Sequence, residues 1–224
     1  MKEYVLYVCD TETTGLNAFK NDVIELSIHR LKDDVQKTWH IKPTNIENID
    51  ADSLRINGHK LEDITHKTKY GKETYKEASS TIIEIENWLM EDGVPSESRV
   101  LVGQNISFDK IMLEQMWIKC NSKETFPFGR RIVDTMQIEF FVDWCKENMA
   151  ESYSLSSLIK KYGIKNEKAH SAAADVKATK ELFEKQVSYF KKISDQVGIP
   201  YQSLINLYLR DCAVSNRKLS LKWA

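Results

Sequence analysis

An apolar run near the N-terminus that ends in two carboxylates constrains the fold more than any other feature. The run Tyr4–Cys9 contains no Gly or Pro, and Asp10 and Glu12 follow it at once. This pattern predicts a buried central β-strand. Because residues i and i+2 of a strand point to the same face, we expect the two carboxylates side by side at its end. A strand that ends in an ordinary polar turn is the alternative, and this pair alone does not exclude it.

Length, composition and cysteine usage are those of an ordinary α/β protein. The 224 residues suffice for one sizeable domain with a small appendage, and 42% hydrophobic and 29% charged residues are usual for a soluble globular chain. The apolar runs are too short to span a membrane, and the first strand begins too early to leave room for a signal peptide. The four cysteines form no C-x-x-C pair, which argues against a zinc site and favours a cytoplasmic location.

Charge is distributed unevenly along the chain. Residues 151–224 hold 13 of the 32 Lys and Arg but 7 of the 33 Asp and Glu, a balance of +6, against −7 in residues 1–150. Several of these lysines precede His170. A basic segment of this kind can contact nucleic acid, but it can equally be the solvated face of a helix.

Hydrophobic periodicity predicts a few strands followed by β–α alternation. The early strands are joined by short connections, which suggests an antiparallel meander. The later strands alternate with helical patterns, and this order implies parallel strands with helical crossovers. Besides the first strand, the expected strands are residues 22–31, 38–43, 99–103 and 130–136.

Helices are expected where apolar residues recur every three or four positions. A capping box at Thr74-x-x-Glu77 predicts a helix that ends near Gly93, and residues 44–74 before it are polar and irregular. The remaining helices are expected over residues 108–115, 138–149, 154–163, 171–194 and 202–213, with a final strand at residues 219–223.

Two more acidic motifs lie near the starts of expected helices. Asp109 falls in the first turn of a helix, where its charge can simply complement the positive helix end. Asp175 follows His170 on the long helix, and three alanines between them leave room for a ligand, although an alanine run is also a good helix former. The strand–helix alternation would gather these residues with Asp10 and Glu12 at one edge of the sheet.

Such a gathering has a chemical consequence. Four unpaired carboxylates in one cleft require divalent cations, and hard oxygen ligands suit Mg²⁺ or Mn²⁺. The set therefore favours two-metal phosphoryl chemistry. His170, whose unperturbed pKa is about 6.5, is suited to act as general base for an attacking water.

Taken together, three motifs resemble those of the DEDD-superfamily exonucleases, in the branch with histidine in the third motif (DEDDh). They are Asp10-x-Glu12-Thr13-Thr14-Gly15, Asn105-x-x-Phe108-Asp109 and His170-x-x-x-x-Asp175. That family includes the proofreading subunits of bacterial replicative DNA polymerases, ribonuclease T and oligoribonuclease. The resemblance runs from about Tyr4 to Phe190. It implies an RNase H-like α/β fold, with a mixed five-stranded sheet flanked by helices, and a metal-dependent phosphodiester hydrolase that removes mononucleotides 3′→5′ from single-stranded nucleic acid.

The resemblance also implies roles for individual residues. Asp10 would bridge two divalent cations, Mg²⁺ or Mn²⁺. Glu12 and Asp175 would complete one metal site and Asp109 the other, while His170 would take the proton from the water. Asp134 would be a supporting residue. Substrate binding is implied at Thr13, Gly15, Leu16, Asn105 and Phe108, the positions that in the family hold the terminal nucleotide and shape its pocket.

The C-terminal segment departs from the family pattern. We expect an exonuclease domain in residues 1–194 and a small helix–strand appendage in residues 195–224. The segment Phe190–Arg210 weakly resembles the helices of ribbon-helix-helix antitoxins, without the DNA-reading strand that precedes the first helix in those proteins. The resemblance implies a homodimer or partner docking through the tail. A terminal helix packed on the nuclease core is the alternative.

The sequence leaves other functions open. A non-catalytic module on the same fold could hold a nucleic-acid 3′ end or a partner, although the complete ligand set argues against it. An exonuclease could trim RNA instead of DNA, because that choice rests on contacts to the 2′-OH that spacing does not show, and we favour DNA. An RNase H-like endonuclease is disfavoured by the spacing of His170. The expected partners are a single-stranded 3′ end and a DNA polymerase or another repair or replication protein, and no membrane.

Overall fold

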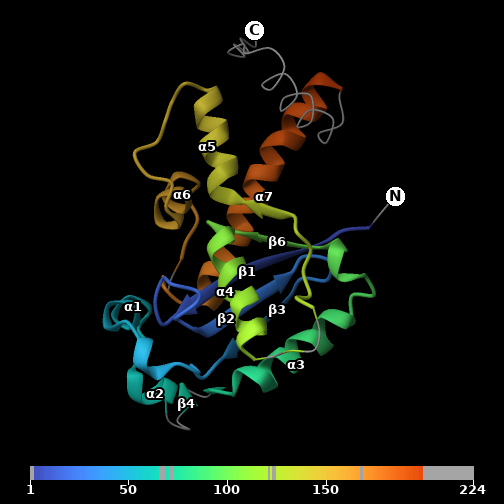
Figure 1. The fold of residues 1–224 in the computed structure, drawn as a ribbon. Coiled ribbons are helices and arrows are strands. Elements are labelled where there is room, and N and C mark those ends of the chain that lie inside the picture. The colour runs from blue at the N-terminus through green and yellow to red at the C-terminus, as the bar shows by residue number, and fades with distance from the viewer. Residues whose placement is uncertain are drawn as a thin grey trace.

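A five-stranded mixed sheet forms the centre of the protein (Figure 1). The computed structural model describes residues 3–65, 69–70, 73–120, 122, 125–166 and 169–198. The strand order is β3-β2-β1-β6-β7; β2 pairs antiparallel with β1 and β3, whereas β6 runs parallel to β1 and β7. This topology confirms the predicted fold class. The strands are β1 Val5–Thr13, β2 Val23–Arg30, β3 Val35–His40, β6 Arg99–Gly103 and β7 Ile132–Asp134.

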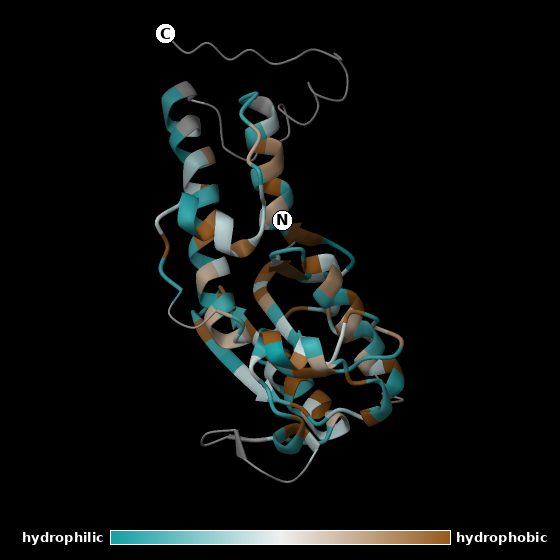
Figure 2. Ribbon diagram, turned by 90° about the vertical axis from the view of Figure 1, so that its left-hand side faces the viewer, coloured by the Kyte–Doolittle hydropathy of each residue, from teal (hydrophilic) through white to brown (hydrophobic). Residues whose placement is uncertain are grey.

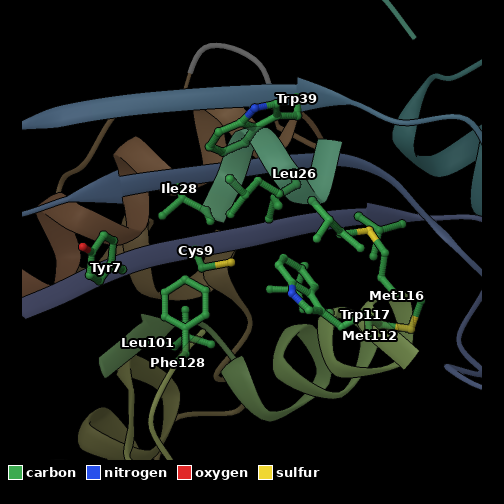
Figure 3. Close-up of a cluster of buried hydrophobic side chains, with 14 of the residues drawn as sticks. Tyr7, Cys9, Leu26, Ile28, Trp39, Leu101, Met112, Met116, Trp117 and Phe128 are labelled. Carbon is green, nitrogen blue, oxygen red and sulfur yellow. The ribbon is translucent and has the colours of Figure 1, made fainter. Parts of the chain in front are cut away.

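Helices cover both faces of the sheet. On one face, α3 (Ala78–Met90) and α4 (Ile106–Lys119) enclose the main core (Figure 3). On the other face, α7 (Ala172–Val197) packs against β1 and β2. The smaller elements are α1 (Ala51–Asn57), α2 (Leu61–Thr65), the 3₁₀ turns Ile46–Asn48 and Ser96–Ser98, and the two-stranded ribbon of β4 (Lys69–Tyr70) and β5 (Glu73–Thr74).

The alternation of side chains along β1 sorts them onto these two faces. Tyr7 and Cys9 belong to the main core, where Figure 3 shows them with residues of α4. Val8 instead packs with Val176 of α7. Because successive side chains of a strand point to opposite faces, the carboxylates of β1 lie on the α7 side, and Thr11 lies on the α4 side. The side chains of β1 therefore contact both helical layers.

A pair of helices extends beyond the sheet. Figures 1 and 2 show α5 (Thr135–Cys145) and the second half of α7 side by side, away from the strands. Gln186 of α7 joins them, since its Nε2 donates hydrogen bonds to the carbonyl oxygen of Thr135 at 2.9 Å and to Glu139 Oε2 at 3.0 Å. The short α6 (Leu155–Lys161) packs on α7 as well.

Some predicted local features are wrong. Thr74 does not cap α3: it pairs with Lys69 in the small ribbon, and the helix begins after Glu77, whose side chain makes no capping bond. The segment predicted as irregular contains α1, because Asp50 caps it by accepting a hydrogen bond from the backbone N–H of Asp52. Within the described part of the chain, no helix is long and apolar enough to cross a membrane. The predicted helix at 202–213 and strand at 219–223 lie outside the described residues.

Candidate active site

Three predicted metal ligands meet where β1 ends. Asp10 and Glu12 come from β1 and Asp175 from the first turn of α7, and each offers an oxygen within 4.8 Å of the others. The strand period places the first two on one face, and the packing of α7 on β1 brings the third to them. A compact set of carboxylate oxygens is the donor type that hard divalent cations take.

Asp109 approaches the same strand from the opposite layer. It lies buried in the first turn of α4. Its Oδ1 accepts two hydrogen bonds from Thr11, one from the backbone N–H at 2.9 Å and one from the hydroxyl at 2.7 Å. Its charge raises the pKa of Asp10, so the two carboxylates are electrostatic neighbours. Asp109 stands beside the three-carboxylate cluster, and the metal-ligand set found among the described residues comprises the other three.

The carboxylates of the site resist ionisation. Burial, with the nearby charges of Asp109 and Glu12, raises the pKa of Asp10 well above its ordinary value. Burial raises the pKa of Glu12 to about 8, and the charge of Asp175 adds to the rise. For Asp109, burial raises the pKa to about 7 although the hydrogen bonds from Thr11 oppose it. These residues therefore fit a divalent cation, because cation binding would relieve the repulsion that now favours protons.

Asp175 is oriented by its own neighbourhood. Its Oδ1 accepts a hydrogen bond from Asn166 Nδ2 at 2.5 Å, and its Oδ2 accepts one from the backbone N–H of His170 at 3.1 Å. Burial raises the pKa of Asp175, and these two donors work against that rise. His170 itself is exposed and has a φ of 63°, in the left-handed region. The backbone N–H of His170 thus binds the carboxylate of Asp175, while the imidazole of His170 stays accessible to solvent.

The substrate residues predicted after β1 lie on a tightly folded turn. Thr13 Oγ1 donates a hydrogen bond to the carbonyl oxygen of Gly15 at 2.8 Å. Gly15 has a φ of 157°, and a Cβ there would come within 2.6 Å of the Asn21 side chain, so only glycine fits. The next residue, Leu16, is 82% exposed. An apolar side chain so exposed on an anchored turn is available to a ligand.

The substrate residues predicted before α4 have different surroundings. Asn105 has a φ of 54° and donates its backbone N–H to Asp134 Oδ1 at 3.1 Å. The same oxygen of Asp134 accepts the N–H of Met136 and so caps α5. Phe108 is half-buried and packs against the main core. Asp134 therefore fixes the backbone at the residue where the second motif begins.

Sequence reasoning missed Glu25. This residue of β2 is 2% exposed and lies directly opposite Glu12 in the β1–β2 register. Burial opposes its ionisation, but the hydrogen bond from His59 and the charge of His40 outweigh burial and hold the pKa of Glu25 below its ordinary value. The signal in the sequence was a glutamate inside an expected buried strand, because a buried glutamate is rare unless it has a partner.

Comparison with known proteins identifies the family. The exonuclease (RNase_T) family model matches residues 7–183. Ribonuclease T of Haemophilus ducreyi is 28% identical over 213 residues, which cover 88% of this chain and 90% of that protein. A PolC-type DNA polymerase III of Mycoplasma genitalium is 27% identical over 207 residues, which cover 89% of this chain but only 12% of that longer protein.

Solved structures agree with this assignment at the level of the fold. Exonuclease I of E. coli in complex with a dT13 oligonucleotide superposes with a TM-score of 0.66 at 16% identity, covering 83% of this chain and 41% of that chain. The family match spans well over half of the present chain. The chain therefore belongs to the exonuclease family that contains ribonuclease T, and it is a DEDD-superfamily 3′→5′ exonuclease that acts on nucleic acid.

Proposed function

We propose that the enzyme releases nucleoside monophosphates from the 3′ end of single-stranded nucleic acid, preferring DNA, by hydrolysis that uses two divalent cations, Mg²⁺ or Mn²⁺. The observation that carries the proposal is the cluster of Asp10, Glu12 and Asp175 within 4.8 Å. Asp109, on the α4 side of β1, adds a fourth carboxylate beside it. The dT13 complex of exonuclease I supports DNA, whereas the ribonuclease T relatives support RNA as the second candidate.

Each charged residue has a role in this proposal. Asp10 would hold both cations, Glu12 and Asp175 would complete one site, and Asp109 would serve the other. Bound cations supply positive charge that polarises the scissile phosphate and makes water a better nucleophile. His170 accepts the proton of the attacking water on an imidazole nitrogen and passes it to solvent, which its exposure permits.

The terminal nucleotide would be held beside these residues. Thr13, Gly15 and Leu16 form the anchored turn at the exit of β1, and Leu16 offers its exposed apolar side chain to a base. Asn105 and Phe108, at the start of α4, would form the other side of the pocket for the terminal nucleotide. Base contacts of this kind are tolerant of sequence, which suits an enzyme that removes any terminal nucleotide.

Partner and location follow from weaker signals. Similarity to the PolC-type polymerases supports action beside a DNA polymerase or another repair or replication protein, although this chain corresponds to about an eighth of their length. Absence of a C-x-x-C pair supports a reducing cytoplasm.

We also propose that residues 195–224 form an appendage to the nuclease domain that packs on it or joins two copies. Gel filtration of a chain ending at Gly198 tests the latter, since an unchanged oligomeric state would exclude dimerisation through the tail.

The decisive assay is degradation of 5′-labelled single-stranded DNA and RNA of one sequence, with Mg²⁺, Mn²⁺ or EDTA. We expect a metal-dependent ladder that shortens from the 3′ end, faster on DNA, and no product from a circular single strand. Asp10→Asn is the matched control, because it keeps the volume of the side chain and removes its charge. Faster decay of RNA would reassign the substrate. Binding of a 3′ end without cleavage would instead support the non-catalytic module.

A further inference from the structure

The helix that carries Asp175 does not cap itself. Ser171 occupies the N-cap position of α7, but its side chain makes no capping hydrogen bond. Its hydroxyl instead donates to Glu25 Oε1 at 3.3 Å. The backbone N–H of Ala173 donates to the same oxygen at 3.3 Å. In a helix this N–H commonly donates to the side chain of the N-cap residue instead. A carboxylate from β2 thus caps the helix from outside, where a negative charge is favourable.

Glu25 is itself held in place from the other side. Its Oε2 lies 3.1 Å from Nε2 of His59 and 3.8 Å from Nε2 of His40. A carboxylate only accepts hydrogen bonds, so Nε2 of His59 donates. The Nδ1 of His59 lies 2.5 Å from the hydroxyl of Tyr75. All four side chains are buried, and the hydrogen bonds of His59 to Glu25 and Tyr75 hold the carboxylate in one orientation.

The segment that supplies His59 also fastens β1. Asn57 Nδ2 donates a hydrogen bond to the carbonyl oxygen of Thr13 at 3.1 Å, and its Oδ1 accepts the backbone N–H of His59 at 3.2 Å. Residues 57–59 therefore connect the end of β1, which carries two carboxylates of the site, to the group that caps α7. The third carboxylate follows within one turn, because the backbone N–H of Asp175 donates to the carbonyl oxygen of Ser171 at 2.9 Å.

We propose that Glu25 is a positioning residue of the exonuclease. It caps α7 across the sheet and sets where His170 and Asp175 lie relative to β1, and His59 orients its carboxylate. The proposal rests on the proposed function, because it assigns Glu25 to the same reaction. Its oxygens are occupied by donors from Ser171, Ala173 and His59, so Glu25 acts through α7 rather than on the substrate.

Substitutions at Glu25 distinguish a positioning role from a contribution to stability alone. We expect Glu25→Ala to lower kcat about 10–100-fold, the usual effect of losing a group that orients metal ligands, with KM within about threefold. Glu25→Gln should recover most of the loss, because its amide oxygen can accept the hydrogen bonds from Ser171 and Ala173. His59→Leu should resemble Glu25→Ala, and the double variant should be no worse than the poorer single one, since both act through one contact.

The control is Asp92→Asn, which weakens a buried ion pair with Arg99, a residue that pairs with the start of β1 while the carboxylates lie at its end. All variants are assayed well below their melting temperatures. Asp92→Asn should lower stability and keep the parental kcat, and if the role of Glu25 were only structural, folded Glu25→Ala would do the same. An unchanged kcat in folded Glu25→Ala, or a change confined to KM, would overturn the proposal.

A second readout does not depend on cleavage. Calorimetric titration of the metal-free full chain with Mn²⁺ should show affinity about 10–100-fold weaker in Glu25→Ala than in the parent, and nearly restored in Glu25→Gln. Equal affinities in parent and Glu25→Ala would contradict the positioning role. If the parent cleaves neither DNA nor RNA, the proposed function fails, and the Mn²⁺ titration still decides the role of Glu25.

Discussion

Thr11 and Asp109 are joined by two hydrogen bonds to a single carboxylate oxygen, one from the backbone N–H and one from the hydroxyl of the threonine. Thr11 stands between the two carboxylates of β1 but faces the opposite layer. The contact fastens α4 to the strand at the point where the acidic residues gather. It also orients the Asp109 carboxylate.

Replacing Thr11 with valine tests this contact, because the shape is kept and only the hydroxyl bond is lost. We expect the free energy of unfolding to fall by about 1–3 kcal/mol, the cost of a buried carboxylate that loses one donor. Turnover should fall about tenfold, since Asp109 is then less well oriented. Thr81→Val is the matched control: Thr81 is buried in α3 and hydrogen-bonded to Glu77, so its loss should lower stability alone. Equal turnover in both variants would contradict this account.

Stability of the metal-free protein should depend on pH in a defined direction. The pKa of Glu12 is raised to about 8 and that of Asp109 to about 7, against about 4 in an unfolded chain. The folded protein therefore binds more protons than the unfolded chain between about pH 4 and pH 8. The contribution of these groups is fully present below about pH 4 and is lost as the pH rises through 7 and 8. We expect the melting temperature in EDTA to fall from about pH 6 to about pH 8.5.

Adding metal should reverse that trend. Mn²⁺ and protons compete for the same carboxylates, so Mn²⁺ should raise the melting temperature more at about pH 8.5 than at about pH 6. Scanning calorimetry at both values measures the difference. Glu12→Gln serves as control, because removing one raised group should flatten the pH dependence of the metal-free protein. A metal effect that is the same at both pH values would speak against shared ligands.

His170 should matter for chemistry and little for folding. Its side chain is exposed, but its φ is 63°, so asparagine is a better replacement than alanine because it tolerates this region. We expect His170→Asn to lower kcat about 10²–10⁴-fold, the usual contribution of a general base, with an unchanged melting temperature. Rapid-quench measurement of the first turnover isolates the chemical step. A fall in stability with kcat preserved would show that the backbone, and not the imidazole, is what the site requires.

Leu16 should affect substrate binding alone. The side chain is 82% exposed, so Leu16→Ala removes little packing and should leave the melting temperature unchanged. Loss of an apolar contact worth about 1.5–3 kcal/mol should raise KM about tenfold or more. Phe19→Ala should weaken substrate binding in the same way, because Phe19 is 75% exposed in the same loop. Ile118→Ala, on the exposed side of α4, is the control and should leave binding unchanged. Fluorescence titration with a labelled single strand in Ca²⁺ or EDTA measures the binding, and an unchanged affinity would remove this turn from the substrate site.

Asp92 should be important for stability and not for catalysis. Its carboxylate is buried and accepts hydrogen bonds from Arg99 Nε at 2.7 Å and from the hydroxyl of Tyr7 at 2.5 Å. Removing one partner of a buried ion pair leaves the other charge uncompensated, so Asp92→Ala should cost about 3–5 kcal/mol. Urea denaturation measures the loss. Turnover below the transition should match the parent, and a large fall in kcat there would implicate this pair in the site.

Local sequence signals predicted the strand that organises the site. The period of a strand is two residues, so Asp10 and Glu12 could be placed on one face from their spacing alone. The motifs around Asp109 and Asp175 added their positions at helix starts, and the parallel pairing of β1 with β6 brought the former close. The strand period and the helix starts depend on patterns within short windows of sequence, which is why they could be predicted.

The role of Glu25 could not be predicted in this way. It depends on the register that places Glu25 opposite Glu12, and a β-bulge between Glu12 and Thr13 shifts that register. It depends also on His59, in a segment whose polar composition predicted no regular structure. The prediction of a capping box at Thr74 was wrong for a related reason, because Thr74 pairs with Lys69 in a small ribbon and α3 begins only after Glu77. Long-range pairing decided each case.

On the proposed function, the position of Asp175 in α7 has a consequence for the time at which activity can arise during synthesis. The strands β1, β2 and β3 are neighbours in the sequence and can pair early, whereas the ligand set is incomplete until α7 docks on them. A chain that is still being translated therefore holds its first carboxylates without the third. We therefore expect nucleic acid close to the ribosome, the messenger included, to escape cleavage by a partly made chain.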